Sequence, residues 1–450
     1  MMQFPFTADT PPEHDGPLPA RADVVVIGGG IAGVMTAFYL ARRGLSVTLC
    51  EKGRVAAEQS SRNWGWVRQQ GRHPAELPVM VEARRLWQGL ARETGEDLGL
   101  AETGVTFLAR TEAELARLET WLPHARAHGV DSRMVSAAEL AALLPGAGRH
   151  WLGGLHTASD MRAEPWRAVP ALARAAAREG VTIREHCAVR LLDIATGRVA
   201  GVVTEKGRIA CDQVVLAGGA WSALFARRHG VNLPQLSVRA TVGATEAMPE
   251  ALPGAAIEMA DGFAVRRRQD GGYTLAPGLL HELYVGPDAF RHFRKYIPQM
   301  RGGHGGTKLR ALVPRGYPDG WTTPRRWAAD RPSPFEAMRV LNPAPNMAAL
   351  DGVATRFAEV FPDLGRPRWA KCWAGMIDVM PDELPVIDEA PEVPGLVIAT
   401  GLSGHGFGIG PGVGRVVADF LLGGQMGHDL LPFRLSRFTD GSPISMGESL

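Results

Sequence analysis

Three glycines near the start of the chain have the spacing with the most recognisable chemistry. Gly28, Gly30 and Gly33 follow the apolar run of residues 24–27 as Gly-x-Gly-x-x-Gly. In such a pattern the first glycine allows a tight turn out of a strand, the second lets the backbone approach phosphate groups, and the third lets the next helix pack close to the strand. The helix N-terminus, with Ile31 and Ala32 in its first turn, offers free N–H groups and a partial positive charge. We therefore predict that this segment binds the pyrophosphate of a dinucleotide.

The sequence after the glycines supports such a site. Apolar residues recur at helical spacing over residues 34–40, Gly44 ends the helix, and residues 46–50 read as the next parallel strand. This strand leads into Glu51. A carboxylate about twenty residues after the glycines accepts hydrogen bonds from the ribose hydroxyls of adenosine and repels the extra phosphate of NADP. The alternative is a glycine-rich turn in an ordinary α/β protein, because the chain contains 54 glycines.

Strands that end in glycine turns occur at two more places, far along the chain. Residues 213–216 form an apolar run that leads into Gly218, Gly219 and Trp221, and residues 395–400 lead into the glycine-rich stretch 401–412 and an apolar helix. One parallel sheet accommodates all three units if the chain returns to it. We therefore predict an α/β fold in which a Rossmann-type domain is assembled from separated segments, with an α+β domain inserted between them.

The intervening segments have other patterns. Residues 76–145 carry apolar residues at helical spacing and read as mainly helical. Residues 232–345 alternate more like strands, and the Asp270-Gly271 turn indicates a β-hairpin. The Gly-, Pro- and Arg-rich stretch 301–350 has no assignment.

Length and hydropathy limit the class of protein. The chain of 450 residues is too long for one simple core, and its 45% of hydrophobic residues is ordinary for a globular protein. No uninterrupted apolar stretch is long enough to span a bilayer. The first 21 residues contain five prolines and no apolar run after a basic start. We therefore expect a loose leader, not a signal peptide, and a cytoplasmic protein.

Charge and cysteine content exclude further classes. The net charge of +2, from 49 basic and 47 acidic residues, gives no reason to expect a nucleic acid partner. The four cysteines are widely scattered, without the paired spacing of a zinc or iron–sulfur site. We therefore expect structural thiols and no metal.

Five blocks of sequence occur in an order and spacing that point to one family. They are residues 28–51, the Ser-Ser-Arg-Asn segment 60–63, the Val-Val-Leu-Ala-Gly-Gly-Ala-Trp strand 214–221, the stretch 373–388 and the Gly-Leu-Ser-Gly-His-Gly-Phe-Gly turn 401–408. With these blocks the chain resembles, over residues 22–425, the FAD-dependent D-amino acid oxidase superfamily, which includes glycine oxidase, sarcosine oxidase and bacterial D-amino acid dehydrogenases. The resemblance implies FAD, not NAD, and oxidation of a carbon–nitrogen bond.

The resemblance also implies where FAD lies. The first glycine loop and Glu51 would hold its adenosine end, the backbone at Val189 would pass the adenine, and residues 60–64 would run past the middle of the cofactor. The turn 401–412 opens a helix whose N-terminus would stabilise negative charge at the pyrimidine end of the flavin. We expect His405 to shape this turn; in the alternative it acts as a base. The residues expected at FAD are Gly28, Gly30, Ile31, Ala32, Gly33, Glu51, Lys52, Ser60, Ser61, Arg62, Asn63, Trp64, Val189, Gly218, Gly219, Trp221, Gly375, Gly404, His405, Gly406, Phe407 and Gly408. Cys372 lies three positions before the site of covalent flavin attachment in sarcosine oxidase, so we expect non-covalent FAD.

Substrate recognition departs from that of several relatives. The arginine that holds the substrate carboxylate in glycine oxidase corresponds to Ile377, and a lysine that sarcosine oxidase uses corresponds to Gly408. Arg68 aligns close to another arginine of sarcosine oxidase, so we expect it to hold the carboxylate; alternatively it is a surface or FAD-phosphate arginine. Asp378 would meet the ammonium group or a basic side chain, unless it is a solvated or helix-capping carboxylate. The expected pocket walls, which are core residues in the alternative, are Trp64, Trp66, Trp373 and Tyr273.

These observations predict a two-domain enzyme that oxidises an amino acid or related amine to the imine, which hydrolyses to a 2-oxo acid and ammonia. Oxygen or a quinone would reoxidise the flavin. We expect the FAD-binding domain to comprise residues 22–75, 146–228 and 371–428, the substrate domain 76–145 and 229–370, and the tails 1–21 and 429–450. Two alternatives stay open: a flavin dehydrogenase of a 2-hydroxy acid or polyol phosphate, and an FAD-binding subunit of a larger complex.

Overall fold

The computed structural model describes residues 4–148, 151–258, 262–278, 280–301, 306–447 and 450. Within these residues a six-stranded sheet has the order β21-β22-β13-β1-β2-β9, and its neighbours are parallel except β21, which is antiparallel to β22. The strands are β1 (Val24–Ile27), β2 (Val47–Cys50), β9 (Thr182–Arg184), β13 (Gln213–Leu216), β21 (Val386–Glu389) and β22 (Leu396–Thr400). Strands from distant parts of the chain therefore lie side by side, and the predicted assembly of a Rossmann-type sheet from separated segments is confirmed.

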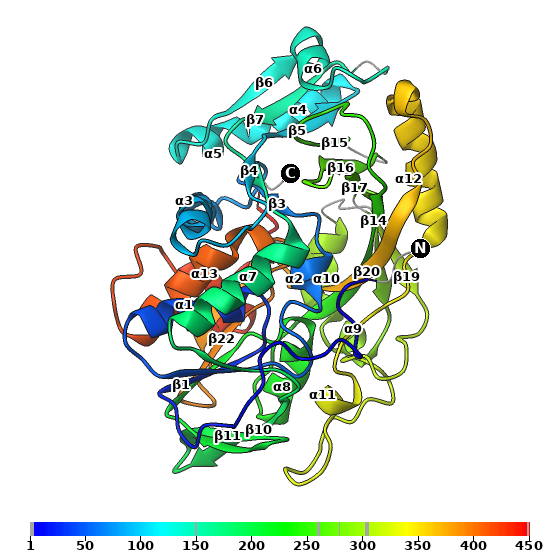
Figure 1. Cartoon of the computed structure of the whole chain (residues 1–450). Coiled ribbons are helices and arrows are strands. Elements are labelled where there is room, and N and C mark those ends of the chain that lie inside the picture. Colours follow the sequence, from blue (N-terminus) through cyan, green and yellow to red (C-terminus); the bar gives the residue numbers. More distant parts are fainter. Residues whose placement is uncertain (1–3, 149–150, 259–261, 279, 302–305, 448–449) are drawn as a thin grey trace.

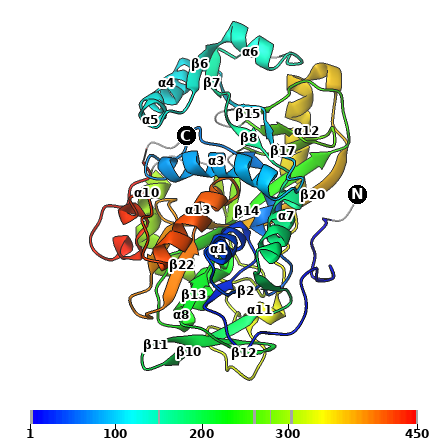
Figure 2. The same ribbon diagram turned by 60° about the vertical axis from the view of Figure 1, so that its left-hand side comes forward.

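Helices cover one face of this sheet (Figures 1 and 2). They are α1 (Ile31–Arg42), α3 (Leu77–Glu93), α7 (Pro165–Arg178) and α13 (Gly406–Leu421). Side chains alternate along a strand, so Val24 and Val26 of β1 belong to the core beneath these helices, whereas Val25 belongs to the core on the opposite face. The first glycine loop and α13 are thereby held on one framework.

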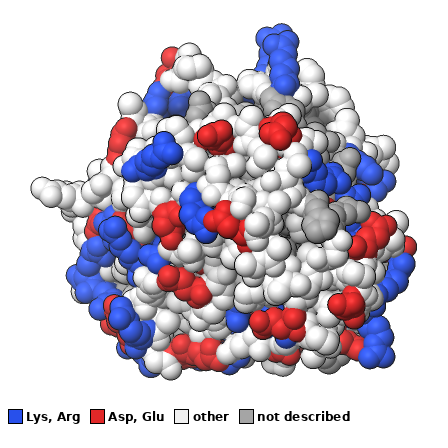
Figure 3. Space-filling view, turned by 90° about the horizontal axis from the view of Figure 1, so that it is seen from above, with Lys and Arg blue, Asp and Glu red and all other residues white. Residues whose placement is uncertain are grey.

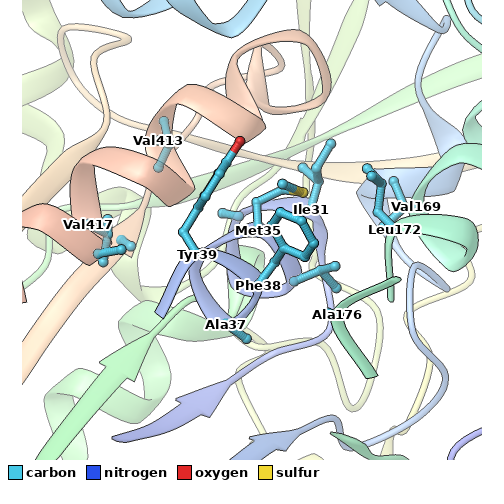
Figure 4. Packing of buried hydrophobic residues seen from close by; sticks show 14 of the residues in the cluster. Ile31, Met35, Ala37, Phe38, Tyr39, Val169, Leu172, Ala176, Val413 and Val417 are labelled. Atoms are coloured by element: carbon cyan, nitrogen blue, oxygen red, sulfur yellow. The ribbon is translucent and has the colours of Figure 1, made fainter. Parts of the chain in front are cut away.

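Glycines let α13 approach α1 closely. A Cβ atom added to Gly414 would lie 2.5 Å from the Cβ of Met35, and one added to Gly410 would lie 2.7 Å from Cγ1 of Ile31. Figure 4 shows Met35, Phe38 and Tyr39 of α1 packed between α13 and α7. This contact positions the N-terminus of α13 beside the glycine loop.

The opposite face carries a small antiparallel sheet and a short helical segment. Its elements are β10 (Val189–Ala195), β11 (Arg198–Thr204), β12 (Gly207–Ala210), the 3₁₀ helix η1 (Gly219–Trp221) and α8 (Ser222–Arg228). Trp221 and Phe225 are buried there against Leu216 of β13.

A second, ten-stranded sheet forms the other part of the molecule. Within the described residues its order is β19-β18-β14-β17-β16-β15-β5-β7-β6, and β20 pairs antiparallel with β14 from Leu236↔Val379 to Thr245↔Trp369. Its strands are β5 (Val105–Ala109), β6 (Ser132–Ser136), β7 (Gly153–Thr157), β14 (Leu236–Thr245), β15 (Ala255–Glu258), β16 (Ala264–Arg267), β17 (Tyr273–Ala276), β18 (His281–Tyr284), β19 (Thr307–Arg310) and β20 (Trp369–Val379). The predicted hairpin is confirmed, because β16 and β17 pair antiparallel on either side of Asp270 and Gly271.

The remaining elements connect the two sheets or cover their edges. Three short strands, β3 (Trp66–Val67), β8 (Met161–Arg162) and β4 (Ala101–Glu102), form a small sheet between them. The helices are α2 (Gln59–Arg62), α4 (Glu112–Thr120), α5 (Leu122–Ala127), α6 (Ala137–Leu143), α9 (Pro287–Arg291), α10 (Phe293–Arg301), α11 (Pro334–Ala337) and α12 (Met347–Val360), with the 3₁₀ helices η2 (Pro362–Leu364), η3 (Leu431–Phe433) and η4 (Leu435–Phe438).

Several segments differ from the sequence-based expectation. Residues 76–145 contain β4, β5 and β6 as well as helices, because a short, fully buried strand such as β5 has no period that separates it from a helix. Helix α3, expected in the substrate domain, packs with α1 and α13. Strand β7, expected in the FAD-binding domain, joins the second sheet. The exact domain boundaries therefore stay a prediction.

The stretches expected as tails pack onto the fold. Phe4 and Phe6 are buried, and the ring of Phe4 lies 5.5 Å from that of Trp373 and 6.0 Å from that of Trp166. Near the other end, Arg437 forms a buried ion pair with Asp382 at 2.7 Å. In the described part of the chain both stretches are thus structural, which corrects the expectation of a loose leader.

The face seen from above carries acidic and basic side chains interspersed (Figure 3). This distribution agrees with the near-zero net charge of the sequence. Among the described residues, no helix is both long and apolar enough to cross a membrane.

Candidate active site

A cavity of about 840 Å³ lies where the carboxyl ends of the parallel strands meet the second sheet. On one side it is lined by residues that follow β1, β2, β13 and β22, namely Gly28, Glu51, Gly218 and Leu402. On the other side it is lined by alternate residues of β14, which are Leu236, Val238, Ala240 and Val242. Ligands of open α/β sheets bind at this carboxyl edge.

The first glycine loop forms one end of the cavity. Gly28 has a φ of +111°, and a Cβ there would lie 2.4 Å from the carbonyl oxygen of Ala217. A Cβ on Gly33 would lie 2.0 Å from the carbonyl oxygen of Gly28, so only glycine permits this contact between helix and strand. Gly30 lines the cavity, and the Ile31 N–H behind it donates to Ser60 Oγ at 2.9 Å. The loop therefore has the open backbone surface that a pyrophosphate needs.

Glu51 lies at the same end, with its carboxylate held by the backbone. Its Oε2 accepts from the Gly29 N–H and its Oε1 from the Gly53 N–H, both at 2.7 Å. Burial raises its pKa to about 7, although Lys52 and these N–H groups favour the charged form. Each carboxylate oxygen can accept a further hydrogen bond, so the predicted contact with ribose hydroxyls is compatible with this arrangement.

Lys52 and Trp221 line the cavity, but their polar atoms hydrogen-bond to other groups of the protein. Lys52 Nζ donates to Glu58 at 2.7 Å and to the carbonyl oxygens of Met338 and Arg339, and it lies 4.4 Å from the centre of the Trp221 ring. Trp221 Nε1 also donates to Glu58, at 3.1 Å. These side chains shape the wall rather than present a free charge.

Arg62 and Asn63 are likewise bound within the fold. The buried Arg62 guanidinium donates to the carbonyl oxygens of Ala57 and Ala374 at 2.8 Å each. Asn63 Oδ1 accepts from the Gly65 N–H at 2.7 Å. Both residues line the cavity, and their bonds fix the segment that runs along it.

The N-terminus of α13 also faces the cavity. Residues 404–407 line it, with His405 as the N-cap residue. Gly408 does not line it, because a Cβ there would lie 3.2 Å from the carbonyl oxygen of Trp66 and 3.5 Å from the Arg68 backbone nitrogen. The first turn of α13 thus abuts the backbone of residues 66–68.

Arg68 presents a guanidinium to the cavity beside that turn. Its Nη1 donates to the carbonyl oxygen of Gln70 at 2.7 Å, and its guanidinium carbon lies 4.9 Å from the centre of the Phe107 ring. Its Nε is buried with no hydrogen-bond partner, and within the described residues it has no ion pair. Burial, and next the charge of Arg72, lower the pKa of Arg68. A carboxylate ligand would offset both the burial of the Arg68 charge and its repulsion by Arg72.

A buried carboxylate hydrogen-bonds to the backbone of the loop that carries Arg68. Asp160 accepts from the backbone N–H groups of Gln69 at 2.7 Å and Gln70 at 3.3 Å. Burial raises its pKa to about 6. Neither Asp160 nor the buried, cavity-lining Arg72 was found from the sequence, because the loop of residues 68–72 has no regular spacing that would place Arg72 beside Arg68.

The structure places two of the other predicted substrate residues differently. Tyr273 is fully buried in the core under α12, and its hydroxyl donates to the Pro249 carbonyl oxygen at 3.0 Å. Trp373 is buried against Phe4 and Trp166 and donates to the Arg62 carbonyl oxygen. These positions correct the expectation that Tyr273 and Trp373 wall the pocket. Trp64 and Trp66 do line it.

Asp378 lines the cavity, but its carboxylate hydrogen-bonds to the start of the turn 401–412. Its Oδ2 accepts from the Gly401 N–H at 2.8 Å and from Gln235 Nε2 at 3.0 Å. Burial raises its pKa. This bonding favours a positioning role over contact with a substrate ammonium group.

The cavity collects nearly all residues expected at FAD. Only Gly33, Ser61 and Gly408 of that set do not line it; the two glycines allow close packing, and buried Ser61 donates to the Glu58 carbonyl oxygen. The glycine loop, the N-terminus of α13 and the volume of the cavity suit a dinucleotide such as FAD.

Comparisons with known proteins agree with this geometry. The family model described as FAD dependent oxidoreductase (DAO) matches residues 23–420. The solved structure of L-amino acid deaminase from Proteus myxofaciens, in complex with anthranilate, is 34% identical with a TM-score of 0.90 over 95% of each chain. Glycine oxidase from Geobacillus kaustophilus is 28% identical over 93% of this chain and 97% of its own length.

A further relative is longer than this chain. Human mitochondrial sarcosine dehydrogenase is 26% identical over 94% of this chain and only 42% of its own length, so the chain spans less than half of that relative. The match to the family model nevertheless covers most of the sequence, and the resemblance inferred from the five sequence blocks is confirmed. The chain belongs to the family of FAD dependent oxidoreductases.

Proposed function

We propose that this protein uses FAD to oxidise the carbon–nitrogen bond of an amino acid or related amine to the imine, which hydrolyses to a 2-oxo acid and ammonia. The observation that carries the proposal is Arg68, a guanidinium without an ion pair in the described residues, which faces the cavity next to the N-terminus of α13. The relatives named as L-amino acid deaminase and glycine oxidase support the same class of reaction.

In this proposal the protein binds and orients the substrate. Arg68 would pair with the carboxylate, and the rings of Trp66 and Phe107, whose centres lie 5.9 Å and 4.9 Å from its guanidinium carbon, would keep that pair away from water. FAD, when bound, supplies the acceptor for the α-hydrogen and its two electrons. The N-terminus of α13 favours negative charge at its end of the cavity. Water then adds to the released imine, which gives the 2-oxo acid and ammonia.

We expect FAD to be held without a covalent bond. Cys372 does not line the cavity, and burial raises the pKa of its thiol to about 11, so that it is not a ready nucleophile. Acid precipitation of the purified protein should release the flavin into the supernatant. Flavin that stays in the pellet would contradict non-covalent binding.

A substrate panel under anaerobic conditions tests the proposed reaction. L-leucine, D-leucine, glycine, sarcosine, a 2-hydroxy acid and a polyol phosphate are added separately to the flavin-loaded protein. Loss of flavin absorbance is measured together with release of ammonia or, from the N-methylated sarcosine, of methylamine or formaldehyde. Bleaching with a stoichiometric amount of that product from one of the four amino acids supports the proposal. Bleaching only by a 2-hydroxy acid or a polyol phosphate would replace it, and bleaching by nothing would favour a subunit without its own substrate site. Reoxidation by oxygen against a quinone then distinguishes oxidase from dehydrogenase, and the cytoplasmic location stays a prediction.

A further inference from the structure

A buried glutamate lies against the histidine that opens α13. Glu76 Oε2 is 3.2 Å from His405 Nδ1, and the Glu76 side chain has no exposed surface. Glu76 is the N-cap residue of α3 and His405 that of α13, so each side chain is held at the start of a helix. His405 lines the cavity, whereas Glu76 lies behind it.

The surroundings determine which atom of the pair carries the proton. Burial would raise the pKa of Glu76, but the hydrogen bond from the His405 Nδ1–H and the positive charge of Arg72 outweigh it and hold that pKa below its ordinary value. An ionised carboxylate only accepts hydrogen bonds, so the proton between the two residues belongs to His405 Nδ1. Burial, and next Arg72, lower the pKa of His405 although Glu76 opposes them. At neutral pH the ring is therefore neutral, and its Nε2 carries a lone pair.

The charged and titratable groups that face His405 come from two segments. Arg72, His73 and Glu76 belong to the loop and helix start after Arg68, and Glu383 belongs to the connection between β20 and β21. In the part of the chain that the structure describes, no group hydrogen-bonds to His405 Nε2. The nitrogen opposite the glutamate is thus free for a ligand of the cavity.

His405 also lies close in the fold to the expected carboxylate anchor. The first turn of α13 begins at Gly406 and abuts the backbone of Arg68 at Gly408, where a Cβ would lie 3.5 Å from the Arg68 nitrogen. The carboxylate and ammonium groups of an amino acid share one carbon atom. A substrate held by Arg68 would therefore present its nitrogen near the start of α13.

We propose that His405 accepts a proton from the ammonium group of the substrate, and that Glu76 is the positioning residue that orients the ring. This inference rests on the proposed function. An N–H bond of the ammonium group breaks and a bond forms between that proton and Nε2, which leaves a neutral amine and an imidazolium still bonded to Glu76 through Nδ1–H. The proton then passes to solvent. The neutral amine is required because its lone pair becomes the second bond of the imine.

Two substitutions separate this role from a structural one. In His405→Asn the amide nitrogen replaces Nδ1 as donor to Glu76, but no proton acceptor remains; in Glu76→Gln the acceptor oxygen remains without its charge. The matched control is His428→Asn, since His428 bonds to Glu82 on the same helix α3 and does not line the cavity. The readouts are kcat/KM from pH 5 to 10 with the fastest amino acid of the panel, FAD content, and the Kd of 4-methylpentanoate, a carboxylate without an amine.

We expect His405→Asn to lower kcat/KM at pH 7 by roughly 100- to 1,000-fold. The deficit should shrink about tenfold per pH unit as the free amine of the substrate becomes abundant. Glu76→Gln should move the acid limb of the profile to lower pH, because the carboxylate no longer raises the pKa of His405. The Kd of 4-methylpentanoate should stay unchanged in all variants, FAD content should stay unchanged in Glu76→Gln, and His428→Asn should behave as the parent.

Other outcomes would overturn the inference. An equal loss at every pH in His405→Asn would show a structural role, as would a loss of affinity for 4-methylpentanoate. If His405→Asn loses FAD, Glu76→Gln decides, and an acid limb that does not move refutes the proposal. Bleaching by an amino acid with an unchanged profile overturns this inference alone, whereas bleaching by no amino acid removes the proposed function and this inference with it.

Discussion

Replacement of Arg68 by alanine tests the substrate site most directly. Arg68 lines the cavity, gives one guanidinium N–H to the Gln70 carbonyl oxygen and forms no ion pair within the described residues, so other N–H groups of its guanidinium can meet a ligand. The aromatic rings of Trp66 and Phe107 lie beside it. The change removes the charge and leaves the loop held by Asp160, which bonds to the backbone of Gln69 and Gln70.

The size of the effect follows from a charge-assisted pair in a partly closed cavity. A hydrogen bond to a charged group contributes about 1.5 to 3 kcal/mol, and we expect about 2 to 4 kcal/mol for a bidentate carboxylate pair. Because about 1.4 kcal/mol corresponds to a factor of ten, kcat/KM should fall by roughly 30- to 1,000-fold. Decarboxylated amines should lose little, since they make no such pair.

Steady-state kinetics with an amino acid and its decarboxylated amine, together with flavin spectra, provide the assay. Arg84→Ala is the control, because Arg84 also follows this loop, in α3, but does not line the cavity and bonds instead to the Ser159 carbonyl oxygen and Glu102. Equal losses for amino acid and amine would refute the anchor role. Loss of FAD in Arg68→Ala would reassign Arg68 to the cofactor.

Three further predictions concern the cofactor loop, the framework and the buried carboxylate. Gly30→Val should nearly abolish FAD binding, because a branched side chain would occupy the pyrophosphate surface; equilibrium dialysis measures it, and full occupancy would contradict the assignment of the loop. Gly414→Ala should destabilise the fold by about 1 to 3 kcal/mol, because its Cβ would lie 2.5 Å from that of Met35. The control is Gly352→Ala in α12, where the added Cβ would meet nothing within 4 Å, so the free energy of unfolding should rise by up to about 1 kcal/mol. Equal effects of the two substitutions in urea denaturation would refute the packing explanation. Asp160→Asn should remove a pH dependence of stability. Because the pKa of Asp160 in the folded protein is raised to about 6, the parent should lose about 1 to 3 kcal/mol of stability as pH rises from about 4 to 6. An unchanged pH profile of unfolding in the variant would contradict this.

The sequence by itself predicted the cofactor framework, because the determinants of that framework are local. A β-branched run followed by Gly28, Gly30 and Gly33 specifies a strand, a turn and a helix start within ten residues of chain. The hairpin at Asp270 and Gly271 was predictable for the same reason. Backbone conformation depends mainly on neighbouring residues, so these patterns retain their meaning before the chain is folded.

The tertiary structure alone decided which side chains share the cavity. Tyr273 and Trp373 read as pocket walls but are core residues, because burial depends on which sheet face the rest of the chain covers. Short buried strands such as β5 were missed, since an apolar run fits a strand or a helix equally well.

The contact between Glu76 and His405 shows the same limit most clearly. These residues are 329 positions apart, and each alone is an ordinary polar residue at a helix start. Their pairing arises because α3 and α13 pack on one sheet face, which brings two helix N-termini together. Protonation states then follow from burial and from charges such as that of Arg72, which exist only in the folded molecule.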